Sequence, residues 1–233
     1  SGNSCAIVVT FNPDSRFNER LALLKAQFPL VIIIDNASQS DARDTLEKLA
    51  MVPGTLLVFN ESNRGIAAAL NQGIACARDS NFGWAVTFDQ DTLVSADLLA
   101  DLIDVHAAIG QNNVLLGGNY EDVHKQRNFI EAKYLGQLFQ ERKTLITSGM
   151  LVPVHATIAL GGFREDYFID SVDHEFCLRA RANGYHVFIS CKPVMRHSIG
   201  SKLEASRYFS RYASFNHSPT TNYFIARNTL ATA

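Results

Sequence analysis

The run Leu30-Val31-Ile32-Ile33-Ile34 constrains the fold of this chain more than any other stretch. An unbroken aliphatic run of this length is typical of a strand that is buried on both faces, as in a parallel sheet covered by helices. Three further apolar runs, at 5–10, 55–59 and 84–88, alternate with segments of helical pattern. Four strands that alternate with four helices predict a doubly wound, mostly parallel α/β sheet, which resembles a nucleotide-binding fold.

The expected helices lie between these runs. They are a segment through Leu21 and Leu24, one through Leu46 and Leu49, an Ala-rich one from Ile66 to Ala77, and one from Ala96 to Ile109 that Ser95 would cap. The regular alternation of apolar strands and helices ends beyond Gly117-Gly118. From there we expect one or two strands between 144 and 153, a short helix at 155–160, a helix that ends at Asn183-Gly184, and a strand at 185–190.

Composition excludes several classes of protein. Of the 233 residues, 47% are hydrophobic and 19% are charged, which permits a sizeable core and argues against wholesale disorder. A net charge of −2 argues against a general nucleic-acid-binding protein. The four cysteines are scattered, without a Cys-x-x-Cys pair. They therefore fit a reducing compartment, such as the cytoplasm, and provide no zinc site or disulfide framework.

Two carboxylates, Asp89 and Asp91, follow the fourth apolar run directly. In an extended chain, side chains two residues apart project on the same side. Ligands of α/β sheets bind at the carboxyl ends of the strands, and one or two carboxylates together with phosphates can hold a divalent cation. A solvated loop is the ordinary alternative, and the pair alone leaves both open.

Other polar groups also follow predicted strands. Asp35 could accept hydrogen bonds from a base or a ribose, or it could form an Asx turn with the residues after it. Asn63-Arg64-Gly65 follows the third strand, and by itself it is better explained as a helix cap and a turn. Neither group by itself decides between the structural and the functional explanation, so the other motifs must be considered with them.

Acidic side chains gather where a later helix is expected to begin, at Asp170, Asp173 and Glu175. Acids in the first turn complement the helix dipole, which is the structural explanation. The functional explanation is a general base, a carboxylate in a cleft that removes a proton from an acceptor hydroxyl.

His197 follows the last predicted strand and lies in a basic stretch. The cations of this stretch are Lys192, Arg196, Lys202, Arg207 and Arg211, with Glu204 as the one acid among them. Such a stretch suits a phosphate-bearing ligand or an anionic membrane surface, although solvated charge is the ordinary explanation.

Eight motifs follow one another along the chain. They are 9–12, 35–38, 63–65, 89–91, 147–149, 161–163, 168–175 and His197. In this order and spacing they resemble the family-2 inverting glycosyltransferases of the GT-A fold, in particular bacterial rhamnosyltransferases that use dTDP-L-rhamnose. The resemblance runs from about residue 5 to residue 230. It implies one GT-A domain over 1–233, with a nucleotide-binding half at about 5–118 and a mixed acceptor and catalytic half at about 119–233.

The resemblance also implies a nucleotide site. The residues that it places around the nucleotide are Thr10, Asn12, Asp35, Asn63, Arg64, Gly65 and Asp89. Asp35 would bind the pyrimidine base or its ribose, and the loop 63–65 would approach from the third strand.

A metal ion is implied as well, either Mg²⁺ or Mn²⁺. Asp91 would ligate the ion, Asp89 would contact the ribose or a metal-bound water, and His197 would be a further ligand.

The same resemblance implies that Asp173 is the catalytic base, because it stands where the second acid of the family's Glu-Asp motif lies. The acceptor hydroxyl would then attack the anomeric carbon with inversion. Val172 stands where many relatives carry Glu, and this departure leaves Asp170 as a competing candidate.

The implied activity is transfer of a deoxysugar from a nucleotide-sugar donor, dTDP-L-rhamnose or another dTDP- or UDP-sugar. The acceptor would be a growing lipid-linked surface glycan or lipopolysaccharide. The enzyme would be cytoplasmic, with room for peripheral contact between its basic C-terminal region and the inner face of the membrane. Because the chain stops within a helical pattern at 228–233, we expect a C-terminal segment to be missing.

Two other functions are compatible with parts of the sequence. The segment 88–93 superficially resembles the Asp-x-Asp-x-Thr/Val nucleophile motif of haloacid-dehalogenase-type phosphatases, but three strand–helix units precede it and no Gly-Asp-x-x-x-Asp occurs. A non-catalytic sugar-nucleotide-binding module is the second alternative, and the candidate base and metal ligands argue against it. A dehydrogenase lacks support because no Gly-x-Gly-x-x-Gly follows a strand.

Overall fold

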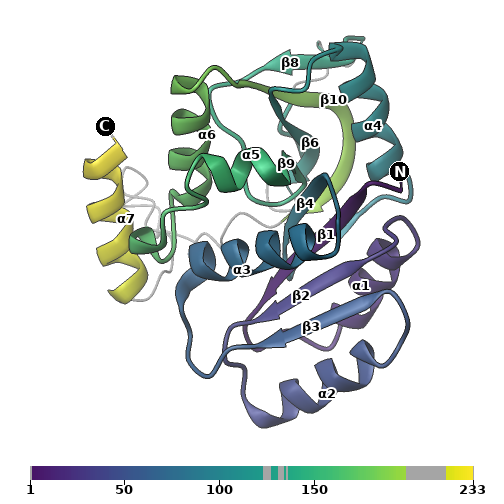
Figure 1. The fold of residues 1–233 in the computed structure, drawn as a ribbon, viewed down its shortest axis with the longest axis vertical. Coiled ribbons are helices and arrows are strands. Elements are labelled where there is room, and N and C mark those ends of the chain that lie inside the picture. The colour runs from purple at the N-terminus through teal and green to yellow at the C-terminus, as the bar shows by residue number, and fades with distance from the viewer. Residues whose placement is uncertain (1, 123–126, 131–133, 135, 198–218, 233) are drawn as a thin grey trace, which may run out of the picture.

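The computed structural model describes residues 2–122, 127–130, 134, 136–197 and 219–232 (Figure 1). Its centre is one mixed sheet with the strand order β3-β2-β1-β4-β9-β6-β10-β5; β7 pairs with β6 and β8 with β10. The predicted α/β class and the mostly parallel sheet with a mixed second half are confirmed.

The first half of the sheet has the predicted strands. They are β1 (Ser4–Thr10), β2 (Val31–Asp35), β3 (Thr55–Phe59) and β4 (Trp84–Asp89). β1 pairs in parallel with β2 and β4, and β2 pairs in parallel with β3. Every residue of β2 is buried, as its aliphatic run predicts. The carboxyl ends of all four strands therefore lie at one edge of the sheet.

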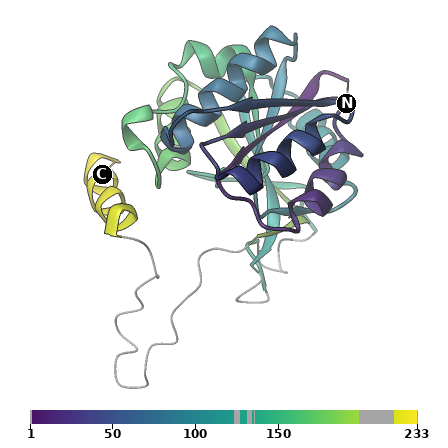
Figure 2. The same cartoon turned by 90° about the horizontal axis from the view of Figure 1, so that it is seen from below.

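Helices cover both faces of these strands. They are α1 (Phe17–Lys25), α2 (Ser40–Ala50), α3 (Gly65–Asp79) and α4 (Leu98–Ile109). α3 packs in one hydrophobic cluster, whereas α1, α2 and α4 contribute to another on the opposite face (Figure 2). α3 approaches β1 closely because its contact face consists of small residues. A Cβ on Gly73 would lie 2.3 Å from Ile7 Cγ2.

The second half is mixed. Its strands are β5 (Leu93–Val94), β6 (Val114–Asp122), β7 (Arg127–Asn128), β8 (Phe139–Glu141), β9 (Met150–Pro153) and β10 (His186–His197). Its helices are α5 (Val154–Ala159), the 3₁₀ turn η2 (Glu165–Tyr167), α6 (Val172–Ala182) and α7 (Pro219–Thr232). β9 lies antiparallel between β4 and β6.

Two local expectations were wrong. Gly117 and Gly118 do not mark a change of pattern; they lie inside β6, a strand that the sequence did not predict. A Cβ at Gly117 would lie 2.6 Å from Leu145 Cδ2, so a side chain there would displace its neighbour. Ser95 does not cap α4, because the chain first forms β5 and the helix begins three residues later, after Asp97.

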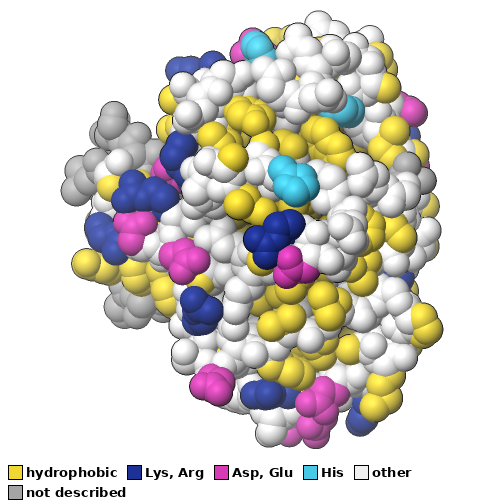
Figure 3. Space-filling view, viewed as in Figure 1, with side chains coloured by type: hydrophobic (Ala, Val, Ile, Leu, Met, Phe, Trp, Pro, Cys, Tyr) yellow, Lys and Arg dark blue, Asp and Glu magenta, His cyan; other side chains and the backbone are white. Residues whose placement is uncertain are grey.

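The surface carries charges of both signs. On the face shown in Figure 3, basic and acidic side chains are interspersed among hydrophobic ones. Within the described parts of the chain, no helix combines the length and the apolar character that a membrane span requires.

Candidate functional site

A pocket of about 260 Å³ opens at the carboxyl edge of the sheet, beside the ends of β1 and β4 and the loop after β3. Four residues predicted from the sequence line it: Thr10, Asn63, Gly65 and Asp89. Asn36, Gln90, Phe168 and Ile169 line it as well, and none of these was predicted to belong to the nucleotide site. The structure thus brings the ends of separate strands together around one cavity.

Asp35 lies behind this pocket rather than on its surface. Its side chain is fully buried, and its Oδ1 accepts hydrogen bonds from Thr10 Oγ1 (2.9 Å) and Ser38 Oγ (2.5 Å). Its Oδ2 accepts a hydrogen bond from the Ser38 backbone N–H (2.9 Å). The Ser38 hydroxyl also accepts a hydrogen bond from the Asn12 N–H (2.7 Å). In this conformation Asp35 holds the loops after β1 and β2 in place.

Asn36 joins the loops that follow β2 and β3. Its Nδ2 donates to Asn63 Oδ1 (2.9 Å) and to the carbonyl oxygen of Gly65 (3.1 Å). Its Oδ1 accepts hydrogen bonds from Asn60 Nδ2 (3.1 Å) and from the backbone N–H of Arg64 (3.0 Å). Because this amide uses both its donor and its acceptor, it fixes the shape of the loop 60–65.

Gly65 lines the pocket, and Arg64 precedes it in the chain. Gly65 has φ 82°, and a Cβ there would lie 2.6 Å from the carbonyl oxygen of Phe168, so only glycine fits. The guanidinium of Arg64 lies 3.9 Å from Glu165 Oε2, and both side chains are about half exposed. An exposed pair of this kind contributes little stability, which leaves Arg64 available to a ligand.

The segment Asp89-Gln90-Asp91 does not continue as an extended strand. β4 ends at Asp89, and the Thr92 N–H donates to the Asp89 carbonyl oxygen (3.3 Å), which closes a turn. The alternation used to place both carboxylates on one side is therefore wrong beyond Asp89. Asp89 is partly buried at the pocket, and Asp91 is exposed.

Gln90, the residue between the two acids, ties this turn to the loop after β1. Its Oε1 accepts a hydrogen bond from the Phe11 N–H (2.8 Å), and its Nε2 donates to the Phe11 carbonyl oxygen (3.2 Å). The Gln90 carbonyl oxygen accepts a further hydrogen bond from Arg20 Nη1 (3.0 Å). The position of the acids is thus set by contacts that span about 70 to 80 residues of sequence.

Asp173 lies in the first turn of α6 and is only partly exposed. Its Oδ2 accepts hydrogen bonds from the Thr147 N–H (2.9 Å) and from Thr147 Oγ1 (3.3 Å), and its Oδ1 accepts one from the His174 N–H (2.8 Å). Desolvation raises the pKa of this carboxyl above that of an ordinary Asp, although these hydrogen bonds and His174 oppose the shift. A raised pKa favours proton uptake, which is what a general base requires.

Asp170, the competing candidate, has a different environment. It is exposed, its φ is 68°, and its Oδ2 accepts a hydrogen bond from Ser171 Oγ (2.9 Å). The geometry therefore favours Asp173 as the base, since Asp173 is the more desolvated and the more firmly held of the two.

The turn 147–149 connects Asp173 with Asp89. Ser148 is fully buried; its Oγ donates to Asp89 Oδ2 (2.7 Å) and accepts a hydrogen bond from the Asp89 N–H (3.0 Å). The preceding residue, Thr147, holds Asp173. Adjacent residues of one turn thus position the candidate base and the pocket carboxylate, a role that the sequence did not reveal.

Of the predicted metal ligands, the structure describes the side chains of Asp89 and Asp91 but not that of His197. His197 is the last residue of β10, and its side chain lies outside what the structure describes, as do Lys202, Arg207 and Arg211. β10 pairs with β5 so that Arg196 lies opposite Leu93, which brings the end of β10 next to the turn that carries Asp91. Among the described residues, no three His, Cys, Asp or Glu side chains converge on one point.

Comparison with known proteins gives the context of this geometry. The family model described as glycosyl transferase family 2 matches residues 5–164. Over 245 aligned positions, the chain is 28% identical to dTDP-rhamnosyl transferase RfbF of Shigella flexneri, covering 98% of this chain and 79% of that protein.

Solved structures show the same fold. S. aureus TarS 1–349 in complex with UDP superposes with a TM-score of 0.67 at 17% identity, over 85% of this chain and 61% of that one. GalNAc-T7 with UDP, GalNAc and Mn²⁺ gives a TM-score of 0.69 at 12% identity, over 87% and 44% of the two chains. The present chain therefore spans about 60% or less of the length of these structures. The predicted GT-A fold is confirmed.

Proposed function

The chain belongs to glycosyl transferase family 2, and we propose that it transfers L-rhamnose from dTDP-L-rhamnose to a hydroxyl group of a growing surface glycan. One observation carries the choice of donor: the chain is 28% identical, over 98% of its length, to a protein named as a dTDP-rhamnosyl transferase. The pocket at the carboxyl edge supports the chemistry, because the turn 147–149 connects its carboxylate Asp89 to a partly buried Asp173.

The nucleotide would occupy the pocket of about 260 Å³. Thr10, Asn63, Gly65 and Asp89 line it, and they would contact the base, the ribose and the diphosphate. Arg64, which precedes Gly65 and is about half exposed, would pair with a phosphate oxygen. Asp35 and Asn12 would act through the loops that they hold, and a direct contact of Asp35 with the base would require those loops to move.

The residues fit a divalent cation, Mg²⁺ or Mn²⁺. Such an ion is commonly held by one or two carboxylates together with substrate phosphates, so two acids at a strand end suffice and a cage of three protein ligands is not required. Asp91 would be the main ligand, with Asp89 and His197 completing the set. When bound, the ion would supply positive charge to the diphosphate leaving group.

Asp173 would act as the general base. The proton of the acceptor hydroxyl passes to a carboxylate oxygen of Asp173, the hydroxyl oxygen forms a bond to the anomeric carbon, and the bond to the dTDP oxygen breaks on the opposite side. This in-line displacement inverts the configuration at the anomeric carbon. The Thr147 N–H, which donates to Oδ2, would orient the base during the transfer.

The acceptor would bind beside Asp173, in the half of the domain at about 119–233, whereas the donor would bind in the half at about 5–118. A lipid-linked glycan is the proposed acceptor class, with the reaction on the cytoplasmic side of the membrane. The basic stretch would provide peripheral membrane contact, but most of its cations lie outside the described residues.

A panel of nucleotide sugars tests the donor. Purified protein is heated with dTDP-rhamnose, dTDP-glucose, UDP-glucose, UDP-GlcNAc or GDP-mannose, each with Mn²⁺, Mg²⁺ or EDTA, and Tm is recorded. We expect the largest increase with dTDP-rhamnose and a divalent ion, because ligand binding stabilises the folded state. No shift with any dTDP- or UDP-sugar would refute the proposal. Covalent labelling of Asp89 by a phosphate mimic, without nucleotide binding, would favour the phosphatase alternative.

A further inference from the structure

The loop that enters α6 has an unusual backbone. Phe168 has φ 59° and ψ −64°, and the Ile169 N–H donates to the Tyr167 carbonyl oxygen (2.6 Å), which together define a γ-turn of the rare positive-φ type. Asp170 (φ 68°) and Ser171 (φ 57°) are also left-handed. Each positive φ costs a non-glycine residue conformational free energy, and three such residues lie within four positions. Contacts with the rest of the protein must offset this cost. Such a conformation persists only where its surroundings hold it.

One side of this turn is held by the start of α3. The Ile66 N–H donates to the Phe168 carbonyl oxygen (2.6 Å), and Gly65 leaves the space for that carbonyl to approach. The loop after β3 and the turn at Phe168 are therefore in direct contact. Both of them line the pocket that we assign to the donor nucleotide.

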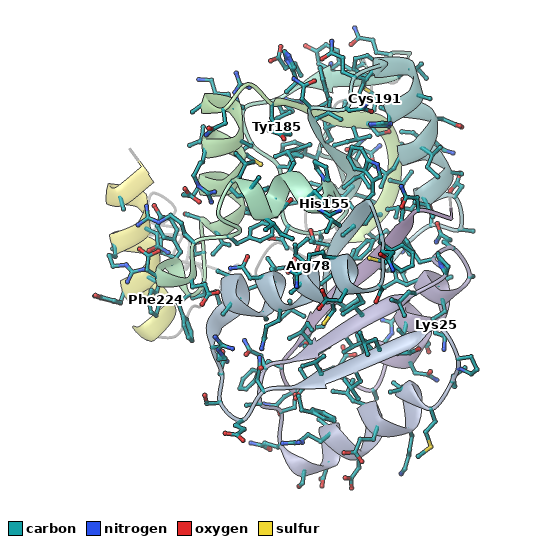
Figure 4. All side chains as sticks on the ribbon, in the orientation of Figure 1. Lys25, Arg78, His155, Tyr185, Cys191 and Phe224 are labelled. Atoms are coloured by element: carbon teal, nitrogen blue, oxygen red, sulfur yellow. The ribbon has the colours of Figure 1, made fainter. Side chains whose placement is uncertain are left out.

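The other side of the turn is held by α7. The fully buried amide of Asn228 donates from Nδ2 to the carbonyl oxygens of Tyr167 (3.0 Å), Ile169 (3.0 Å) and Asp170 (2.9 Å). One helical turn earlier, the ring of Phe224 stacks on the ring of Phe168, with centroids 5.0 Å apart and an interplanar angle of 17°. Figure 4 labels Phe224 on the side of α7 that faces the domain, and Figures 1 and 2 show α7 beside η2.

We infer that Asn228, assisted by Phe224, is a positioning residue of the donor pocket. The amide holds the strained turn whose residues Phe168 and Ile169 form one wall of that pocket. α7 thus supports one wall of the donor pocket without lining it, although Asn228 follows the end of β4 at Asp89 by more than 130 residues. The identification of the ligand as a nucleotide rests on the proposed function, whereas the holding of the turn does not.

The chemistry requires an amide at this position. Three carbonyl oxygens converge on the Asn228 Nδ2, whose two N–H groups are shared among them, so the position requires a hydrogen-bond donor. The Asn228 Oδ1 faces the other way and accepts a hydrogen bond from Arg227 Nε (3.0 Å). An Asp side chain has the same shape but presents oxygen to oxygen, so the carbonyl groups would lose their partner and be repelled.

Asn228→Asp is therefore the test, with Asn113→Asp as its matched control. Asn113 Nδ2 also donates to a backbone carbonyl oxygen, that of Gly184 (2.7 Å), but it is located before β6, at the opposite edge of the sheet from the pocket. We expect the Kd for dTDP with Mn²⁺, measured by calorimetry, to rise about tenfold in Asn228→Asp and to stay unchanged in Asn113→Asp.

Hydrogen exchange provides a readout that does not depend on the nucleotide. The amides of Ile66 and Ile169 donate into the turn, so both should exchange faster in Asn228→Asp than in the wild type or in Asn113→Asp. If Asn228→Asp does not fold, Phe224→Leu removes the ring stack, together with the contacts of that ring with Arg227 and Tyr223, and leaves the Asn228 amide in place. It should raise the Kd about threefold and speed the same two amides to a smaller extent.

The outcomes separate this inference from the proposed function. A wild-type protein that binds no dTDP would overturn the donor assignment, and the exchange of the two amides would then decide whether Asn228 holds the turn. Wild-type affinity for dTDP in the Asn228 variant, or unchanged exchange at Ile66 and Ile169, would overturn the inference itself.

Discussion

Ser148→Ala should loosen the carboxylate of Asp89 without touching the ligand directly. The Ser148 hydroxyl is fully buried and makes three contacts: it donates to Asp89 Oδ2 (2.7 Å), accepts from the Asp89 N–H (3.0 Å), and lies 2.7 Å from Thr92 Oγ1. A hydrogen bond to a charged group contributes about 1.5–3 kcal/mol and a neutral one about 0.5–1.5 kcal/mol. We therefore expect the variant to lose about 3 kcal/mol of unfolding free energy.

Ligand binding should weaken for a separate reason. In the wild type the Asp89 carboxylate is already oriented, whereas in the variant it must be ordered when the ligand binds. Ordering one side chain costs about 0.5–1.5 kcal/mol, which corresponds to an increase in Kd of up to about tenfold. Calorimetric titration of dTDP in the presence of Mn²⁺ measures this change, and urea unfolding measures the stability.

Ser190→Ala is the matched control. Ser190 is also fully buried, and its Oγ donates to a carboxylate, Asp101 Oδ2 (2.5 Å), but this pair links β10 to α4 rather than to the pocket. Both variants should lose stability, and only Ser148→Ala should lose affinity. Equal losses of affinity in the two variants, or unchanged affinity in Ser148→Ala, would refute the assignment of Ser148 as the residue that orients Asp89.

Three further changes test the site. Asp91→Ala should abolish the increase in Tm that Mn²⁺ adds to nucleotide binding, and an increase that survives would remove Asp91 as the main metal ligand. Asp173→Asn should bind nucleotide and lose turnover. Because burial raises the folded-state pKa of Asp173, its ionisation destabilises the fold as pH rises through that pKa. The Asn variant should thus be more stable relative to the wild type at pH 8 than at pH 4 in urea unfolding, and an equal difference at both pH values would contradict the raised pKa. Gly65→Ala should lose more stability than Gly110→Ala: both have left-handed φ (82° and 69°), which costs an alanine about 1–2 kcal/mol, but only at Gly65 does the new Cβ meet another atom within 4 Å.

The strands of the first half could be predicted because their signal is local. Each apolar run is about as long as one strand, and β2, β3 and β4 begin or end within a residue of the predicted runs. β6 was not predicted because Gly117 and Gly118 contribute no side chain to its hydrophobic pattern. β10 continues to His197, well beyond the predicted end at Ser190, because Lys192 and Pro193 interrupt its apolar run while the strand continues.

The sequence could predict the types of the site residues and their positions near strand ends, but not the contacts that they make. Asn63 follows a strand and lines the pocket, whereas Asp35 ends β2 and is buried. The sequence could not show that Asp35 is buried behind the pocket, because its partner Thr10 is 25 residues away. The contacts of Asn228 were harder still to predict. Its partners lie about 60 residues earlier, and the residue types at 168–171 do not indicate the left-handed backbone that they adopt.

The direction of β9 explains how the two candidate carboxylates come to share one turn. β4 is parallel to β1 and β2, so its carboxyl end carries Asp89 to the pocket edge. β9 runs antiparallel to β4, and therefore its first residue lies at that same edge. The polar turn 147–149 precedes β9 instead of following it, yet it reaches Asp89 through Ser148 and Asp173 through Thr147. Had β9, with its 4 residues, been parallel, the same turn would lie at its far end, about 13 Å away at roughly 3.3 Å per residue. Reversal of this one strand thus connects the first half of the sheet to α6 in the second half, which is why a search for polar residues after strands finds Asp89 and overlooks the turn that holds it.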